Sequence, residues 1–333
     1  MLRTTLDSPA IPKVRTRVLA TQTTVYICVL LMAAVGAFAY KFRADTIFAC
    51  QADGYSADRY IAYCNGANYA DYEHGAFGFG LEPSVQNFAR NADVLFLGNS
   101  HMQVAFSTKS TSDWFSTASI RYYLMGFTYY ENVVFAEPLL RRIKPNAKVY
   151  VINVDDFFNR WETPPAKAIL DDPDGRSRYE MKRLWQRIHE PVCKGLPALC
   201  GDDLVYYRSR ETGAYTKRPG RQRITPVSYD QSVDQAVVSS NTAAAIDFLS
   251  HLPVKRDCVI LTMTPTVGTK IGNANAIAKA LGETLVAPEI PELQTFDTSH
   301  LQQESAERWS AAFFQLAGSK IEACLKHEDT AHP

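Results

Sequence analysis

Short apolar segments alternate with amphipathic segments over most of the chain, and this alternation constrains the fold more than any other feature. Runs typical of buried strands occupy residues 93–98, 120–124, 148–154 and 258–263. Stretches with apolar residues at helical spacing occupy residues 128–143, 230–252, 273–281 and 301–325. Strands that alternate with helices form βαβ units, in which helices cover both faces of a mostly parallel sheet. The sequence therefore predicts an α/β domain.

Two segments do not follow this alternation. Residues 159–228 separate the third strand from the next helix and are rich in Arg, Lys and aromatic side chains. We interpret this segment as an insertion that caps one end of the sheet. Residues 41–90 are rich in Tyr, Ala and Gly, and we interpret them as a stalk that leads into the domain. The domain itself is expected over residues 91–325, followed by a short tail at 326–333.

The N-terminal part of the chain contains an apolar run without charged residues, at positions 24–40. A run of this length is at the short limit for a membrane-spanning helix. Basic residues precede it, including Lys13, Arg15 and Arg17, which favours a cytoplasmic tail over residues 1–23 and export of the remainder. We therefore expect one membrane anchor at 24–40, placing the protein in the inner (cytoplasmic) membrane with its domain in the periplasm or outside. A cleaved signal peptide is the alternative, because Ala37-Phe38-Ala39 fits a small-x-small cleavage site.

The charge balance excludes one large class of partners. Lys plus Arg and Asp plus Glu each number 35, so the formal net charge is zero. Nucleic-acid-binding proteins carry a basic excess or a basic face, and the sequence shows neither. We expect no nucleic-acid partner.

The cysteine content supports export. Cys28 lies in the apolar run, and six cysteines follow it: Cys50, Cys64, Cys193, Cys200, Cys258 and Cys324. Short loops would close between the first two and between the next two, which leaves the last two for each other. Six cysteines allow 15 connectivities, so this pairing is a hypothesis, and free thiols are the alternative. Disulfides belong to an oxidising compartment. Because no pair shows the CxxC spacing that zinc sites favour, we predict no metal site.

The strand at residues 93–98 ends in the sequence LFLGNSHMQ, residues 95–103, which places Ser100 just after the strand. A serine at this position is either an ordinary turn residue or a nucleophile. A serine hydroxyl is a weak nucleophile until a base, itself held by a third group, removes its proton. The carboxyl ends of the strands are where α/β sheets bind ligands, so the position suits a nucleophile.

A matching base and acid lie about 200 residues later. In FDTSH, Asp297 precedes His300 by three residues, just before the last predicted helix. An Asp-x-x-His arrangement on one loop can deliver an oriented imidazole to a distant serine. The alternative is that Asp297 only caps the helix N-terminus, as Asp often does.

Together these two segments resemble the SGNH (GDSL-type) hydrolase superfamily, over about residues 92–160 and 258–318. The resemblance implies a flavodoxin-like three-layer α/β/α sandwich with an N-terminal transmembrane helix and an inserted segment added. It also implies Ser100 as the nucleophile, His300 as the general base and acid, and Asp297 as the residue that orients His300. It implies no cofactor.

The family has two further sequence motifs between the serine segment and the Asp-x-x-His segment, and this chain matches them less closely. Gly126, after the second strand, and Asn153, at the end of the third, are the candidates for oxyanion-hole donors. Asn99 stands where the family usually has Asp, and His101 where it usually has Leu. Asp155 falls where the family aligns Asn. We predict His101 and Asp155 as substrate contacts. An aspartate at this place resembles membrane-anchored SGNH-like proteins that help to acylate envelope polymers.

The resemblance and the anchor together predict a serine-dependent O-acyltransferase or esterase that acts on a cell-envelope or extracellular polysaccharide. Attack of water on an acyl-enzyme gives hydrolysis, and attack of a sugar hydroxyl gives transfer. The expected partners are the polysaccharide, an acyl donor and an integral-membrane acyltransferase. A non-catalytic glycan-binding or scaffold protein of a polysaccharide modification complex is the alternative, and a lipase-like hydrolase is a weaker one.

Overall fold

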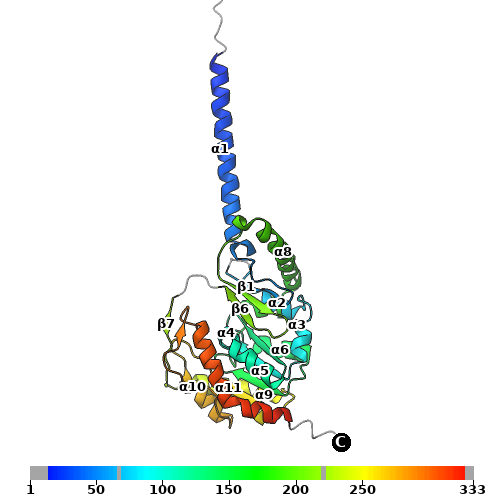
Figure 1. Ribbon diagram of the computed structural model, residues 1–333, viewed down its shortest axis with the longest axis vertical. Helices are drawn as coiled ribbons and strands as arrows, with labels where there is room; N and C mark the ends of the chain where they lie inside the picture. Colours follow the sequence, from blue (N-terminus) through cyan, green and yellow to red (C-terminus); the bar gives the residue numbers. More distant parts are fainter. Residues whose placement is uncertain (1–13, 66–68, 219–222, 327–333) are drawn as a thin grey trace, which may run out of the picture.

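The computed structural model describes residues 14–65, 69–218 and 223–326. A long helix, α1 (Val14–Ala44), leads from the N-terminus into a body that contains all other elements (Figure 1). Residues 1–13 of the expected cytoplasmic tail and residues 327–333 of the expected C-terminal tail lie outside the described residues, as do 66–68 and 219–222. The chain is a mixed α/β protein.

The body is built on a parallel four-stranded sheet in the order β3-β2-β4-β8. Its strands are β2 (Val94–Asn99), β3 (Tyr122–Phe127), β4 (Val149–Asn153) and β8 (Val259–Thr262). They correspond to the four runs predicted from sequence, and nearly every side chain in them is buried. Parallel strands buried on both faces read as continuous apolar runs, which is why the sequence revealed them.

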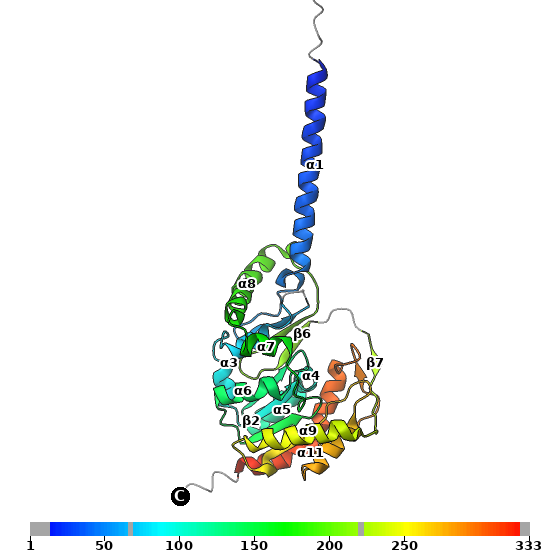
Figure 2. The same cartoon turned by 180° about the vertical axis from the view of Figure 1, so that it is seen from behind.

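Helices cover both faces of this sheet. Leu95 and Leu97 of β2 pack into one apolar cluster, and Val94 and Phe96 pack into the other. The first cluster includes α6 (Val133–Ile143), α9 (Gln235–Ser250) and α10 (Ile271–Ala280). The second includes α4 (Ser100–Phe106), α5 (Lys109–Ala118) and α11 (Gln303–Lys326). Helix α11 is nearest the viewer in Figure 1, and α9 in Figure 2.

Residues 41–90 differ from the expected stalk, because they pack against the inserted segment. Strand β1 (Arg59–Cys64) pairs antiparallel with β5 (Val205–Ser209), which pairs with β6 (Tyr215–Arg218). Tyr60 and Tyr72 are fully buried. We call this unit the anchor lobe. Its helices are η1 (Ile47–Ala49), α2 (Tyr72–Gly78), α3 (Val85–Arg90), α7 (Pro164–Leu170), α8 (Gly175–Gly195) and η2 (Pro197–Leu199).

Two short strands and a 3-10 helix complete the fold. Strand β7 (Thr225–Pro226) pairs with β9 (Gln294–Thr295), and η3 (Arg256–Cys258) leads into β8. The β7–β9 pair holds the loop that precedes α11 against the body. That loop contains the predicted acid and base.

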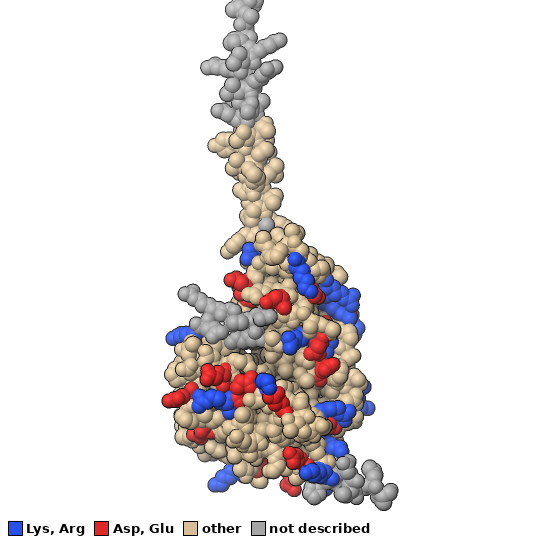
Figure 3. All heavy atoms as spheres, viewed as in Figure 1, with Lys and Arg blue, Asp and Glu red and all other residues tan. Residues whose placement is uncertain are grey.

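The segment Thr23–Ala44 of α1 is long and apolar enough to cross a membrane, with a mean hydropathy of 1.9 and none of it buried. Figure 3 shows no charged side chain along the tan part of this helix above its junction with the body, while charges of both signs are scattered over the visible face of the body. Lys41 and Arg43 lie in the last turn of the helix. An apolar helix that packs on its own chain only in its last turns, as this one does through Phe42, needs an apolar environment for the rest of its length. This helix is therefore suited to anchor the body to a membrane.

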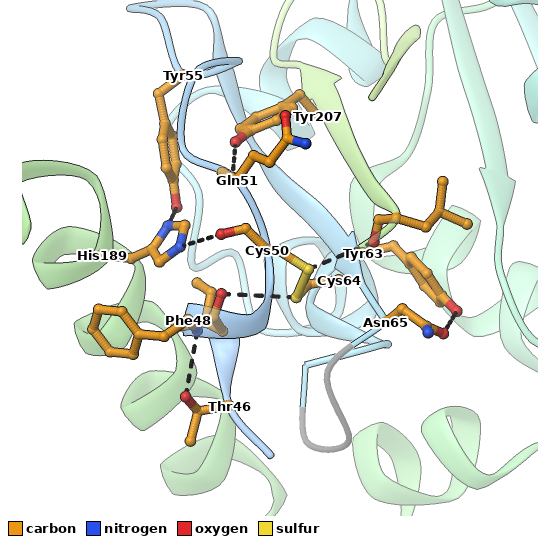
Figure 4. The surroundings of a disulfide bond; sticks show 12 residues. Thr46, Phe48, Cys50, Gln51, Tyr55, Tyr63, Cys64, Asn65, His189 and Tyr207 are labelled. Atoms are coloured by element: carbon orange, nitrogen blue, oxygen red, sulfur yellow. Dashed lines mark hydrogen bonds between the residues drawn. A yellow bond between two sulfur atoms is a disulfide. The ribbon is translucent and has the colours of Figure 1, made fainter. Parts of the chain in front are cut away.

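Three disulfides join the pairs that the sequence suggested, Cys50–Cys64, Cys193–Cys200 and Cys258–Cys324. Cys28 is free and exposed in α1. The first bridge ties the residue after η1 to the end of β1 within the anchor lobe (Figure 4). Since such bridges persist where the redox environment is oxidising, they suggest an oxidising compartment for the body.

The bridge between Cys258 and Cys324 is expected to contribute the most stability, because it closes the longest loop, at a sequence separation of 66 residues. Replacing both cysteines by Ala should lower the free energy of unfolding by about 4 kcal/mol, since the unfolded chain regains loop entropy. Urea unfolding of the detergent-solubilised chain measures this loss. Cys28→Ala is the control and should leave the midpoint unchanged. Equal midpoints for all three proteins would contradict the prediction.

Candidate active site

The predicted nucleophile lies at the junction of β2 and α4. Asn99 is the last residue of β2 and the N-cap of α4, where its Oδ1 accepts a hydrogen bond of 2.9 Å from the backbone N–H of His101. This cap ends the strand and begins the helix at Ser100. The serine is 9% exposed at the carboxyl end of the sheet. The local sequence thus places a hydroxyl at the edge where α/β sheets bind ligands.

The structure brings Ser100, His300 and Asp297 together although 200 residues separate the serine from the histidine. His300 Nε2 lies 2.8 Å from Ser100 Oγ, and His300 Nδ1 lies 2.8 Å from Asp297 Oδ2. An ionised carboxylate only accepts hydrogen bonds, so Nδ1 of a neutral His300 carries the proton and Nε2 accepts from the serine hydroxyl. This is the geometry of a serine nucleophile, its base and the group that orients the base.

Asp297 both holds the histidine and shapes its loop. Its Oδ1 accepts the backbone N–H groups of Ser299 and His300, at 3.0 and 2.7 Å. Burial raises the pKa of Asp297, but the hydrogen bond and charge of His300 and these N–H groups outweigh it and hold the pKa below its usual range. Thr298 has a φ of 74°, which β-branched residues avoid, and makes the turn possible. Because α11 begins only at Gln303, these N–H groups belong to the loop, and Asp297 does not cap the helix as the alternative interpretation supposed.

His101 and Asp155, predicted as substrate contacts, bind each other. His101 Nδ1 makes a short hydrogen bond to Asp155 Oδ2, and His101 Nε2 lies 2.5 Å from Ser299 Oγ. Burial raises the pKa of Asp155, but the hydrogen bond and charge of His101 lower it further than burial raises it. The carboxylate is thus held in its ionised form. Sequence reasoning picked out both residues but not Ser299, their partner on the loop between Asp297 and His300.

The geometry gives a reason for Asn at position 99. Besides capping α4, Asn99 donates from Nδ2 to Asp155, 3.2 Å from its backbone oxygen and 3.3 Å from its Oδ2. An aspartate here could still cap the helix, but it would place a second negative charge beside Asp155. Like charges at this distance disfavour ionisation. Asn99 is therefore the residue type that fits beside an ionised Asp155.

Of the two predicted oxyanion donors, the N–H of Gly126 is already hydrogen-bonded and the side-chain amide of Asn153 is buried. The N–H of Gly126 donates to Gln103 Oε1 at 3.0 Å. Asn153 Oδ1 accepts from the N–H of Thr264 at 2.9 Å, and its Nδ2 is buried without a hydrogen-bond partner among the described residues. An oxyanion-hole role for Gly126 requires its bond to Gln103 to break. Glycine is required there because a Cβ would lie 2.6 Å from Gln103 Cβ.

Ser100 and His300 open into a cavity of about 290 Å³ between the sheet and the anchor lobe. Its lining consists of Tyr63, Ser100, Thr128, Tyr129, Tyr130, Leu204, Tyr206, Asp297, Ser299 and His300. Tyr129 and Tyr130 have φ angles of 64° and 55° and are 40% and 48% exposed. Strain of this kind persists where the surroundings hold it. The anchor lobe adds Tyr63, Leu204 and Tyr206, which sequence reasoning missed.

A buried ion pair holds the loop that carries these tyrosines. Arg208 Nη1 lies 2.7 Å from Glu73 Oε2, and both side chains are fully buried. Glu73 Oε1 accepts the N–H of Thr128 at 2.8 Å, and Arg208 Nη2 donates to the Leu124 oxygen at 2.6 Å. The pair therefore joins α2 and β5 of the anchor lobe to β3 and to the residue that follows this strand. It couples the lobe to one wall of the cavity.

A second cluster of titratable groups surrounds His189 in the anchor lobe (Figure 4). His189, Cys193 and Cys200 place potential ligand atoms within 4.8 Å of one another, but the two cysteines form a disulfide. His189 Nε2 lies 3.0 Å from the Cys50 oxygen and Nδ1 3.2 Å from the Tyr55 hydroxyl. Burial lowers the pKa of His189 to about 4. A neutral histidine with both nitrogens bonded is a structural residue.

Comparisons with known proteins yielded no match among family models, curated proteins or solved structures. The chemistry of the cavity is therefore inferred from the positions of its residues alone.

Proposed function

We propose that this chain is a membrane-anchored, exported acyl-ester enzyme of the SGNH type with a flavodoxin-like sandwich fold. The observation that carries the proposal is the pair of 2.8 Å contacts that join Ser100 to His300 and His300 to Asp297 beside a cavity. Serine, imidazole and carboxylate in this order activate a hydroxyl for attack on a carbonyl carbon.

In the proposed reaction Ser100 Oγ attacks the ester carbonyl and gives its proton to His300 Nε2. The ester C–O bond breaks, the leaving alcohol takes that proton, and an acyl-Ser100 ester remains. Water or a sugar hydroxyl then attacks this ester, with His300 as the base again. Asp297, kept ionised by its hydrogen bonds, stabilises the imidazolium formed in each half-reaction.

The substrate class follows from the cavity walls and the anchor. Tyr129, Tyr130 and Tyr206 present aromatic surface next to the nucleophile, and aromatic rings present apolar faces with a polar edge that suit sugar rings. The helix and the disulfides support a place at the inner membrane with the body in the periplasm or outside. We therefore propose a cell-envelope or extracellular polysaccharide as the substrate or acceptor. A membrane-embedded acyltransferase would supply acyl groups.

Ester turnover with and without an acceptor tests the proposal. The full chain in detergent is given a chromogenic acetyl ester, alone and with a polysaccharide that carries free hydroxyls. His300→Asn should lower ester turnover by about 10²–10⁴-fold, because the serine loses its base. Acyl groups found on the polysaccharide by mass spectrometry indicate transfer, and free acetate alone indicates hydrolysis.

His251→Asn is the matched control, since His251 is a surface residue that is 54% exposed. It should leave turnover unchanged. Equal turnover in wild type and His300→Asn would contradict the proposed function.

A non-catalytic glycan-binding protein is the second candidate, and one observation favours it. Of the predicted oxyanion donors, Gly126 donates its N–H to Gln103, and Asn153, whose unpartnered Nδ2 is buried, is not among the residues that line the cavity. Removing a single oxyanion donor can cost an enzyme about 10²–10³ in turnover. Glycan binding without any ester turnover would favour this candidate.

A further inference from the structure

The loop between Asp297 and His300 carries a second hydroxyl with its own imidazole and carboxylate. Ser299 Oγ lies 2.5 Å from His101 Nε2, and His101 Nδ1 is hydrogen-bonded to Asp155 Oδ2. The order of groups is the same as in Ser100, His300 and Asp297. We infer that Ser299 is a second nucleophile for acyl esters, activated by His101 and oriented by Asp155. This inference rests on the proposed function, because it concerns the same cavity.

The hydrogen-bond roles of the second set follow from its chemistry. Asp155 is ionised and can only accept, so Nδ1 of a neutral His101 donates to it. His101 Nε2 is then an acceptor, and the Ser299 hydroxyl donates to it. The serine proton therefore already points at the base that would remove it. Asn99, the residue before Ser100, holds the Asp155 carboxylate in place by donating a hydrogen bond to it from Nδ2.

Both serines reach the same cavity. Ser100 and Ser299 are lining residues, while His101 is 8% exposed behind them. The rings of His101 and His300 are 5.2 Å apart between centroids and meet edge to face. His101 follows Ser100 in sequence but bonds Ser299, and His300 follows Ser299 but bonds Ser100. Two imidazolium ions at this separation repel each other, so the two sets are expected to react alternately and not together.

The reaction at Ser299 balances as it does at Ser100. Ser299 Oγ attacks the ester carbonyl, its proton moves to His101 Nε2, and the ester C–O bond breaks. The leaving alcohol takes the proton, and an acyl-Ser299 ester remains. With a fluorophosphonate, the Oγ–P bond forms, the P–F bond breaks, and fluoride and the proton leave to solvent.

Peptide mapping after fluorophosphonate labelling tests the inference on the full chain in detergent. Labelling over hours detects a serine that reacts too slowly to sustain turnover. In wild type we expect one label per chain, distributed between Ser100 and Ser299. In S100A the label should lie on Ser299, in S299A on Ser100, and S100A/S299A should have none. His101→Gln in the S100A background should reduce labelling of Ser299 at least about tenfold, since removing a general base costs 10²–10⁴-fold.

His300→Gln in the S299A background is the matched variant for Ser100, His300 and Asp297. Thermal melting measures whether each variant is folded. Label on Ser100 alone in wild type, with none on Ser299 in folded S100A, would overturn the second nucleophile and leave the proposed function standing. Labelling of Ser299 that survives His101→Gln would overturn the assigned base. No label on either serine in wild type would overturn both proposals.

Discussion

Ser100→Ala is expected to lower acetyl-ester turnover by about 10³-fold or more, while the chain stays folded. The variant removes the Oγ atom of Ser100 that bonds His300, and removal of a triad nucleophile in serine hydrolases costs a factor of this order or larger. Initial rates with a chromogenic ester, measured on the detergent-solubilised chain, give the ratio directly.

Ser116→Ala is the matched control for this substitution. Ser116 lies on α5 and is exposed to solvent, so the change removes the same atom far from the base. It should leave the rate and the melting temperature unchanged. A Ser100→Ala protein as active as Ser116→Ala would refute Ser100 as the nucleophile.

Arg208→Met is expected to lower the free energy of unfolding by about 3–5 kcal/mol, because it leaves the buried carboxylate of Glu73 without its counter-charge. The same carboxylate holds the N–H of Thr128, at the start of the segment that carries Tyr129 and Tyr130. We therefore also expect a raised KM for polysaccharide acceptors. Denaturant unfolding and acceptor titration measure the two effects.

The double variant Glu73→Gln/Arg208→Met distinguishes the effect of leaving a buried charge unpaired from the effect of losing side-chain volume. The introduced glutamine can still accept the Thr128 N–H, and the introduced methionine fills part of the space of Arg208 without leaving a charge. The double variant should therefore be more stable than Arg208→Met alone. A single variant as stable as wild type, or a double variant less stable than the single one, would show that the pair does not govern the stability of the lobe.

The parallel sheet could be predicted because its signals are local. Each of the four strands is an apolar run that stands out against its flanks, as in KVYVINV at residues 148–154. The antiparallel pairing of β1 with β5 could not be predicted, since the two strands lie far apart in sequence and neither shows a regular alternation of apolar and polar residues. Pairing of that kind depends on contacts that no short window contains.

The candidate site also has residues that could be predicted from sequence and residues that could not. Ser100, Asp297 and His300 were predictable because each follows a strand or precedes a helix in a recognisable order. Ser299 was not singled out, because its neighbour His300 accounted for the motif, and only the fold brings His101 to it. The cavity wall of Tyr63 and Tyr206 belongs to the anchor lobe, whose position follows from tertiary packing alone.

The junction between α1 and the anchor lobe is rigid. Phe42, in the last turns of the helix, packs on Phe48 and Trp185 with ring centroids 5.3 and 5.9 Å apart. Arg43 donates to the Ala198 oxygen, and the buried helix η1 follows after only two residues. If α1 spans a membrane, as proposed, this short connection holds the cavity between lobe and sheet at a constant height above the bilayer. Under the proposed function, a polymer would then be modified only where it passes that level.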